Sequence, residues 1–294
     1  MKNCNLCPRK CNINRETSIG FCGVNNDIVI SKVMIHTGEE PLLTQPHDKG
    51  SGAIFFSGCN LKCVYCQNYD ISHHIKGKKF SVKDLVNVFK LLEDKGAGNI
   101  DLVTPTHYSK QIIQALKSYK PKVPVIWNSN GYESIETLKQ LEGLVDIYLV
   151  DYKYNDDNLA ISYSKAPNYS EIVKKSIREM KRQQPINIFD NNKLVKGIIV
   201  RHLLLPNNTN DSKKILDNIY NILGTETILS LMSQYVPMGK ANDFEALKRT
   251  IMPIEYKIIV NYAKRLGFTN IYTQELTSST SDFTPNFNAC LFEF

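Results

Sequence analysis

The sequence predicts an α/β protein with a mainly parallel sheet. Short β-rich runs alternate with helical stretches from about residue 53 onward, and about six such repeats follow one another. Strands that alternate with helices pair in parallel through right-handed crossovers. The chain has 294 residues, 42% of them apolar, which is enough to bury the core of one α/β barrel. Six repeats are fewer than the eight of a complete barrel.

The first strand and helix show the pattern. The run AIFFS at 53–57 reads as a strand, and apolar residues then recur at helical spacing over 82–92. Ser81 is a suitable N-cap, and Asp84 stands three residues later. Gly267 suits the C-cap of the last helix. The later strands are predicted at 99–103, 123–127, 146–150, 195–205, 228–232 and 270–274, and the later helices at 110–119, 134–142, 169–183, 211–223 and 254–266.

Composition narrows the class of protein. No stretch approaches the ~18 apolar residues of a membrane span, and the polar start of the chain lacks the apolar core of a signal peptide. We therefore expect a soluble cytoplasmic protein. The formal net charge is +7, spread over many Lys-rich helices. This distribution favours a solvated surface over nucleic-acid binding, with a patch that steers an acidic protein partner as the alternative.

The cysteines are concentrated at the start of the chain. Seven of the eight lie within the first 66 residues, and only Cys290 lies outside. A disulfide framework usually serves a much smaller secreted domain. Closely spaced thiols in a chain without a signal peptide favour metal ligation instead. Cys290 stands alone and is predicted to be a small buried hydrophobic residue.

Three cysteines form a compact loop after the first predicted strand. Cys59, Cys63 and Cys66 have the spacing Cys-x3-Cys-x2-Cys. Three thiolates on a four-iron cubane leave one iron without a protein ligand, and an open coordination position is what a catalytic metal centre needs. The alternatives are a zinc site that takes another ligand elsewhere, or reduced structural thiols.

This loop resembles the signature of the radical S-adenosylmethionine (SAM) superfamily, including an aromatic residue, Tyr65, directly before the last cysteine. The stretches GSGAIFFSGC at 50–59 and CVYCQN at 63–68 are similar to the pyruvate formate-lyase activating enzyme homologues, and the resemblance extends along the whole chain. It implies a partial six-stranded parallel (βα) barrel of radical SAM type. We assign this barrel to residues 46–294 and a Cys-rich extension to residues 1–45.

The resemblance also implies the cofactors and the reaction. A [4Fe-4S] cluster on the three cysteines would bind SAM at its open iron. One electron from the reduced cluster would cleave the sulfonium to methionine and a 5′-deoxyadenosyl radical, which abstracts hydrogen from a substrate. Tyr65 would pack near the adenine, and plain loop packing is its alternative.

Polar residues follow the predicted strands, where the reactive groups of parallel α/β folds gather. The resemblance implies that they hold SAM. Asn128-x-Asn130-Gly131 is similar to a third-strand motif of the activases, and Asp151-x-Lys153 to a motif whose lysine meets the SAM carboxylate. Each could also be an ordinary cap or turn. The full set of candidate SAM ligands is Tyr65, Thr104, Thr106, His107, Asn128, Asn130, Asp151, Lys153, Arg201 and Gln234.

The chain departs from the family at the end of the second strand. Residues 104–107, TPTH, occupy the place of a Gly-Gly-Glu-like motif that binds the SAM amino group. The hydroxyls of Thr104 and Thr106 can still accept from an ammonium. His107 is a SAM contact, a substrate-side acid or base, or a structural histidine. No residue is assigned as a catalytic acid or base.

Four more thiols precede the barrel. Cys4, Cys7, Cys11 and Cys22 fall within 19 residues, and four soft ligands at this spacing fit zinc or a second iron–sulfur cluster equally well. Reactive free thiols are the alternative.

The leading hypothesis for function is hydrogen abstraction from a protein backbone, as in glycyl-radical-enzyme activation, with flavodoxin or ferredoxin as the reductant. Lys76, Lys78 and Lys79 form a candidate docking patch, although a solvated lysine run is the simpler interpretation. The alternatives are radical modification of a small molecule, a peptide or an RNA base, or a non-catalytic iron–sulfur or zinc protein that regulates or carries electrons. The sequence names no substrate.

Overall fold

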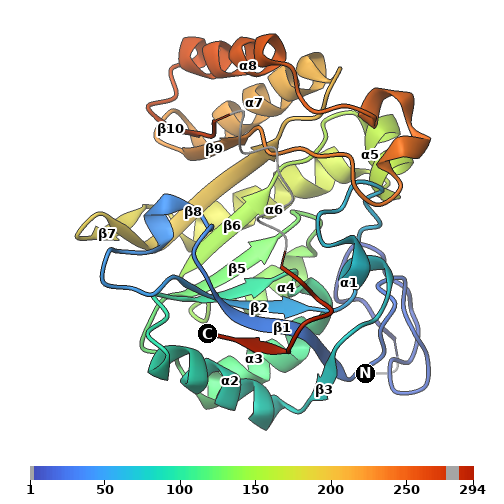
Figure 1. Cartoon of the computed structure of the whole chain (residues 1–294), viewed down its shortest axis with the longest axis vertical. Helices are drawn as coiled ribbons and strands as arrows, with labels where there is room; N and C mark the ends of the chain where they lie inside the picture. Colours follow the sequence, from blue (N-terminus) through green and yellow to red (C-terminus); the bar gives the residue numbers. More distant parts are fainter. Residues whose placement is uncertain (1–2, 276–284) are drawn as a thin grey trace.

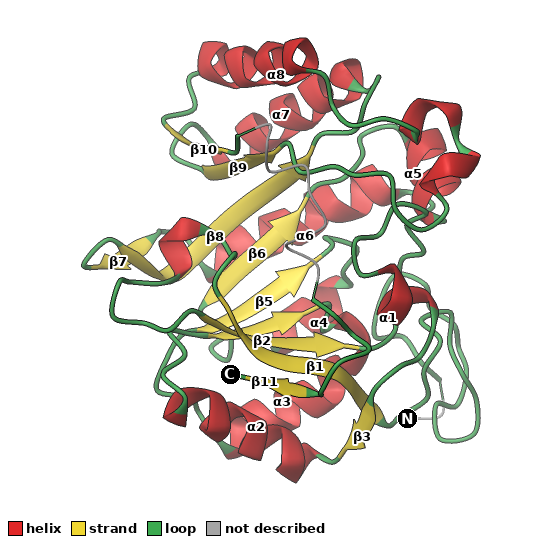
Figure 2. Ribbon diagram, in the orientation of Figure 1, coloured by secondary structure: helices red, strands yellow, loops and turns green. Residues whose placement is uncertain are grey.

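The computed structural model describes residues 3–275 and 285–294. In this part of the chain, eleven strands form one curved sheet in the order β10-β9-β8-β6-β5-β4-β2-β1-β11, with β3 beside β1 and β7 beside β8. The longer helices cover the outer face of the curve, and loops gather at one end of it (Figures 1 and 2). The sheet is therefore a partial barrel with an inner face left for a site.

The parallel strands confirm the predicted α/β class. Each pairs with the next in parallel register, and a seventh strand, β10, continues beyond the six of the expected barrel. They are β2 (Ser51–Phe56), β4 (Ile100–Val103), β5 (Val125–Ser129), β6 (Ile147–Asp151), β8 (Lys193–Leu203), β9 (Ile228–Met232) and β10 (Asn270–Thr273).

The helices also follow the predicted repeats. Ser81 caps α2 in a reciprocal capping box with Asp84, and Gly267 ends α8 with φ +91°, in the left-handed region that favours glycine. The main helices are α2 (Val82–Asp94), α3 (Ser109–Ser118), α4 (Ile135–Gln140), α6 (Tyr169–Gln183), α7 (Thr209–Leu223) and α8 (Pro253–Leu266). Two shorter helices, α1 (Tyr69–His73) and α5 (Asp157–Ser164), were not predicted and lie in loops near the site.

Further strands at the sheet margins were also not predicted. β1 (Ile28–His36) runs antiparallel to β2, so part of the expected extension joins the sheet. The proposed division into residues 1–45 and 46–294 stays a prediction. β3 (Lys78–Phe80) pairs with β1, and β7 (Ile188–Asp190) pairs with β8.

The late strand β11 joins the sheet beside the early strand β1. β11 (Phe292–Glu293) pairs with it in parallel. Lys32 is fully buried there, and its ammonium contacts the Glu293 carboxylate at 2.5 Å and the Cys290 carbonyl at 3.0 Å. The prediction that Cys290 is buried was wrong, because its side chain is exposed beside this short edge strand.

An apolar layer closes the amino end of the barrel. The short helix η1 (Pro41–Leu43) places Leu43 against inward-facing residues near the starts of several strands, and the Asn99 amide donates to the Leu43 carbonyl at 2.8 Å. The layer consists of Leu43, Ile126, Ile147, Leu149, Leu194, Ile199 and Ile228. Polar side chains on the inner face gather toward the opposite, carboxyl end of the strands.

Candidate functional site

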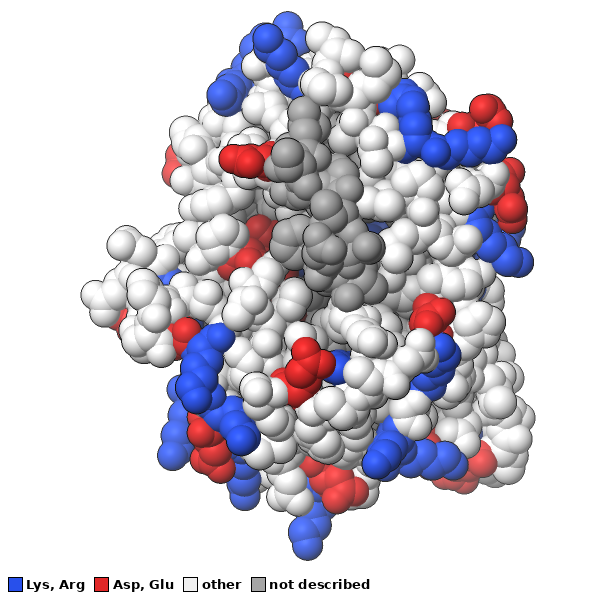
Figure 3. All heavy atoms as spheres, viewed as in Figure 1, with Lys and Arg blue, Asp and Glu red and all other residues white. Residues whose placement is uncertain are grey.

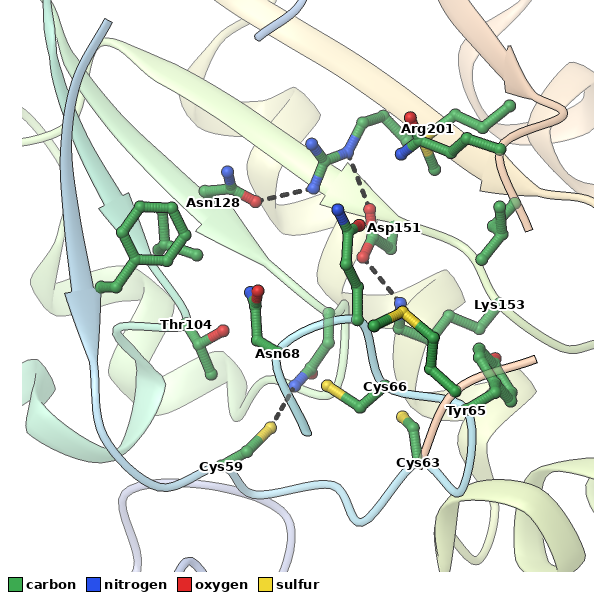
Figure 4. A pocket seen from close by; sticks show the side chains of 18 of the residues that line it. Cys59, Cys63, Tyr65, Cys66, Asn68, Thr104, Asn128, Asp151, Lys153 and Arg201 are labelled. Carbon is green, nitrogen blue, oxygen red and sulfur yellow. Dashed lines mark hydrogen bonds and ion pairs between the residues drawn. The ribbon is translucent and has the colours of Figure 1, made fainter. Parts of the chain in front are cut away.

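A cavity of about 220 Å³ lies at the carboxyl ends of the parallel strands. The three cysteines of the loop line one side of it, and ionic side chains from β6 and β8 line the other (Figure 4). Of the predicted SAM ligands, the cavity brings together Tyr65, Thr104, Asn128, Asn130, Asp151, Lys153, Arg201 and Gln234. These side chains therefore meet at one edge of the sheet, as expected for groups at the carboxyl ends of parallel strands.

Each cysteine of the loop receives a hydrogen bond to its sulfur. The Asn130 amide donates to Cys59 Sγ at 3.4 Å, Ser164 Oγ donates to Cys63 Sγ at 3.0 Å, and Ser72 Oγ donates to Cys66 Sγ at 3.3 Å. Donors aimed at sulfur suit thiolates that carry negative charge. Cys59 and Cys63 are buried and Cys66 is partly exposed, and these three soft, hydrogen-bonded sulfurs fit a thiolate-bound cluster.

Burial sets the protonation of these thiols in the absence of metal. It raises the pKa of Cys59 to about 12 and that of Cys66 to about 11. A metal centre that binds here must displace those protons, so loading depends on pH. Within residues 3–275 and 285–294, no group of three or more His, Cys, Asp or Glu side chains is arranged to hold a single metal ion.

Arg201 organises the opposite wall of the cavity. It lies across from Asp151 in the β6–β8 register, and its Nε donates to the Asp151 carboxylate at 2.8 Å. A second guanidinium nitrogen donates to Asn128 Oδ1 at 2.7 Å. Lys153 Nζ donates to the other Asp151 oxygen at 2.7 Å. Burial alone would raise the pKa of Asp151, but Arg201 and Lys153 lower it, so the carboxylate stays charged between two cations.

The sequence analysis missed Glu39, which lies in the segment between β1 and η1. Its carboxylate contacts Arg201 at 3.2 Å and lines the cavity. Asp101 lies nearby on β4, where the Asn128 amide donates to it at 3.2 Å. Burial, and secondly the charge of Glu39, hold the pKa of Asp101 well above its usual range. Without the fold there is no local signal for this contact, because Glu39 and Arg201 are 162 positions apart.

The residues after β4 divide into two groups. Thr104 lines the cavity and has φ +58°, a left-handed conformation that favours glycine, which the family carries at this place. The structure does not bring Thr106 and His107 to the cavity. Thr106 donates to Glu133 at 2.6 Å, and His107 Nε2 lies 2.8 Å from the Ser57 carbonyl. Burial lowers the pKa of His107 to about 3, so the ring is neutral and supports the cysteine loop from behind.

Glu133 is a second residue that the sequence analysis missed. This buried carboxylate accepts hydrogen bonds from Thr106 at 2.6 Å, Ser129 at 2.5 Å and the Trp127 indole at 3.1 Å. The three donors come from β5 and the loop after β4. Glu133 therefore fixes the two loops that carry Thr104 and Asn130.

Tyr65 begins a chain of hydroxyl groups that ends at a cluster ligand. Its hydroxyl lies 2.5 Å from that of Tyr154, which lies 2.6 Å from Ser164 Oγ, the donor to Cys63. Its ring packs edge-on against Tyr235 with centroids 5.8 Å apart. Gln234 also lines the cavity and accepts from the Gln274 amide at 3.1 Å.

The comparisons with known proteins fit this site and fold. The sequence model of the radical SAM superfamily matches residues 53–219, more than half of the chain. The chain therefore belongs to the radical SAM superfamily, which implies an enzyme with a [4Fe-4S] cluster that binds SAM. The resemblance noted in the sequence is confirmed at this level.

Two curated proteins are similar to this chain in sequence. The chain is 32% identical over 281 residues to an uncharacterized protein of Methanocaldococcus jannaschii, covering 92% of this chain and 77% of the relative. It is 25% identical over 182 residues to the pyruvate formate-lyase-activating enzyme of Clostridium pasteurianum, covering 58% of this chain and 68% of that enzyme.

A solved structure supports the fold. The crystal structure of Streptococcus suis SuiB bound to its precursor peptide SuiA matches with a TM-score of 0.51 at 14% identity, over 75% of this chain and 48% of SuiB. The match thus spans about half of that larger protein. Within the described residues, no helix combines the length and apolar character needed to cross a membrane.

Proposed function

We propose that this protein holds a [4Fe-4S] cluster on Cys59, Cys63 and Cys66 and uses it to cleave SAM reductively. The observation that carries the proposal is the shared cavity, in which three supported thiols face the ionic group of Arg201, Asp151 and Lys153. When bound, the reduced cluster supplies one electron to the sulfonium of SAM, which yields methionine and a 5′-deoxyadenosyl radical.

The side chains around the cavity bind and orient SAM. Lys153 and Arg201 offer positive charge to its carboxylate, and Arg201 presents a planar fork suited to bidentate contact. Asp151 holds both cations in place through bonds of 2.7 and 2.8 Å. Asn130 ties the loop after β5 to the cysteine loop by donating to Asn60 Oδ1 at 2.8 Å.

The proposed substrate is a glycine in a protein backbone, and the similarity to the Clostridium pasteurianum activating enzyme supports this choice. Flavodoxin or ferredoxin is the proposed reductant. In the candidate docking patch, Lys76 pairs with Asp70 at 2.9 Å and Lys79 pairs with Asp27 at 2.7 Å. These carboxylates offset part of the positive charge that would attract an acidic reductant. On the face shown in Figure 3, Lys and Arg side chains stand in separate groups around the edge. A cytoplasmic location stays a prediction.

The first experiment tests SAM cleavage. The full chain is reconstituted anaerobically with iron and sulfide, reduced with dithionite and given SAM, and 5′-deoxyadenosine is quantified by mass spectrometry. We expect product from the wild type and from Cys290→Ala, whose thiol is exposed and distant in sequence from the loop. Cys63→Ala should lose the activity. An intact cluster without product in the wild type would refute the proposal.

A second experiment tests the substrate class. Cells from the same source are grown with deuterated glycine, and their extract is separated by filtration into protein and small-molecule fractions. Each fraction is incubated anaerobically with the loaded enzyme and unlabelled SAM. Deuterium in 5′-deoxyadenosine from the protein fraction supports abstraction from a glycine residue. Deuterium that arises only with the small-molecule fraction excludes it.

A further inference from the structure

The N-terminal segment is ordered without helices, strands or disulfides. Residues 3–27 contain no regular element, and their four cysteines are free thiols. The chain folds back on itself through bonds from the Cys4 amide to the Ile13 carbonyl at 2.8 Å and from the Asn12 amide to the Cys4 carbonyl at 3.1 Å. The segment has little apolar surface of its own and is anchored to the barrel, where the buried Arg15 guanidinium donates to the His107 carbonyl.

The four thiols of this segment lie close together. A methyl group built on Gly20 would be 3.5 Å from Cys22 Sγ and 3.7 Å from Cys11 Sγ, so both sulfurs face one point. Cys22 interacts electrostatically with Cys4 and Cys11, and Cys7 interacts with Cys22 and Cys11. Cys7 and Cys22 are 8% exposed. The segment thus holds four free thiols, two of them facing one point, that the radical SAM site does not use.

This set of thiols lies directly behind the cluster loop. The Cys59 amide donates to the Cys22 carbonyl at 3.2 Å. Gly58 has φ +85°, and a Cβ there would lie 2.6 Å from the same carbonyl, so only glycine permits this approach. The side chain of Thr137 adds a bond to the Leu6 carbonyl at 2.7 Å.

Arg9 stands between the two sets of cysteines. Its Nε donates to the Asn60 carbonyl of the cluster loop at 2.8 Å, and its guanidinium lies 3.7 Å from the Phe21 ring centroid. It interacts electrostatically with cysteines of both sets, namely Cys7, Cys11 and Cys59. Its Nη2 is buried without a hydrogen-bond partner among the described residues. A half-buried cation with a buried spare donor suits neighbouring groups of negative charge.

We propose that Cys4, Cys7, Cys11 and Cys22 bind a second iron–sulfur cluster, which rests against the loop of the SAM-binding cluster. Zinc needs four thiolates about 2.3 Å from one point, whereas a cubane binds each thiolate through a different iron. All four thiols are free and lie within the described residues, so they can supply one thiolate to each of four irons. The segment also packs against the loop for which the family implies the first cubane.

The test uses the full chain with the first site removed. In Cys59→Ala/Cys63→Ala/Cys66→Ala, purified anaerobically without reconstitution, we expect about four irons and four sulfides per chain, against about eight in the wild type. Mössbauer and EPR spectra should show a [4Fe-4S] signal. Adding Cys7→Ala and Cys22→Ala should remove this iron, whereas adding Cys290→Ala should not.

Each outcome bears on the proposal. Zinc in place of iron overturns the iron–sulfur assignment, and a triple variant that folds by circular dichroism but holds no metal overturns the site. If the triple variant fails to fold, the reciprocal variant Cys7→Ala/Cys22→Ala decides, because it should lose about half of the wild-type iron. The proposed SAM cleavage is tested separately in the wild type, so the two proposals can fail independently.

Discussion

The hydrogen bond from Ser164 to Cys63 leads to a quantitative prediction about the cluster. Ser164 Oγ donates to Cys63 Sγ at 3.0 Å, and the hydroxyl of Tyr154 lies 2.6 Å behind it. Reduction adds negative charge to the cluster and its thiolates. A donor at this sulfur therefore stabilises the reduced state more than the oxidised one and raises the reduction potential.

The size of the effect follows from the strength of such bonds. A hydrogen bond to a charged group contributes about 1.5–3 kcal/mol, and we take ~1 kcal/mol as the part that differs between the two oxidation states. A tenfold change in equilibrium constant corresponds to about 1.4 kcal/mol, or 59 mV for one electron. Ser164→Ala should therefore lower the midpoint potential by about 40 mV. Tyr154→Phe leaves the serine-to-sulfur bond in place and removes the contacts of the Tyr154 hydroxyl with Ser164 and Tyr65, so it should lower the midpoint potential less.

The assay is an anaerobic redox titration followed by EPR, on samples with equal iron content. Ser162→Ala is the matched control, because Ser162 lies on the same helix and its side chain is only half-buried. A midpoint potential in Ser164→Ala that equals the control, or lies above it, would refute the reasoning. Equal SAM cleavage alone would not settle the matter, since dithionite can reduce both proteins.

Three further outcomes are expected. Arg201→Met removes the guanidinium that binds Asp151 and Asn128 and that we propose to bind the SAM carboxylate. Because one hydrogen bond to a charged group contributes about 1.5–3 kcal/mol, loss of the bond to SAM should lower the SAM affinity measured by equilibrium dialysis at least tenfold. Wild-type affinity in the variant would argue against a role of Arg201 in binding. Asp101→Asn removes a carboxyl whose pKa is raised by burial and by the charge of Glu39. In the wild type, the unfolded chain therefore loses this proton at a lower pH than the folded chain does. The free energy of unfolding then falls as the pH rises above 3.8. The free energy of unfolding measured with urea should fall less steeply in the variant than in the wild type between about pH 4 and 7. An equal slope in the two proteins would contradict the assignment. Glu293→Gln removes the negative charge that the buried Lys32 ammonium contacts at 2.5 Å, at a cost of about 1.5–3 kcal/mol or a drop of about 3–6 °C in Tm. Adding Lys32→Met should recover part of this drop, and no recovery would point to another cause.

Most helices and strands could be predicted from local patterns in the sequence. The helix at 169–183 and the strand at 228–232 have the predicted bounds, because their apolar patterns lie within the segments themselves. The cysteine loop was found in the same way, from the spacing of three residues. β1 was missed although its sequence, IVISKVMIH, is rich in β-branched residues, because the predicted boundary at residue 45 set it apart from the barrel.

Contacts between residues far apart in the sequence could not be predicted from it. Ser164 and Cys63 are 101 positions apart, and no pattern near either residue marks the pair. Thr106 and His107 were wrongly placed in the site for a related reason. They follow a strand, as site residues do, but their side chains turn toward Glu133 and Ser57. Which side of a loop faces the cavity depends on the packing of several elements, and the sequence of one loop does not contain that information.

The seam between β1 and β11 also has a consequence for biosynthesis. Lys32 and Cys290, whose carbonyl accepts from the lysine, are 258 positions apart. At the usual elongation rate, the ribosome needs about 13–50 s to make the residues between them. During that time the outer edge of β1 near Val33 has not received β11, and an unpaired edge is a template for aggregation. The pairing of β1 with β11 is therefore a late step of folding, and nascent chains that still lack β11 should depend on chaperones.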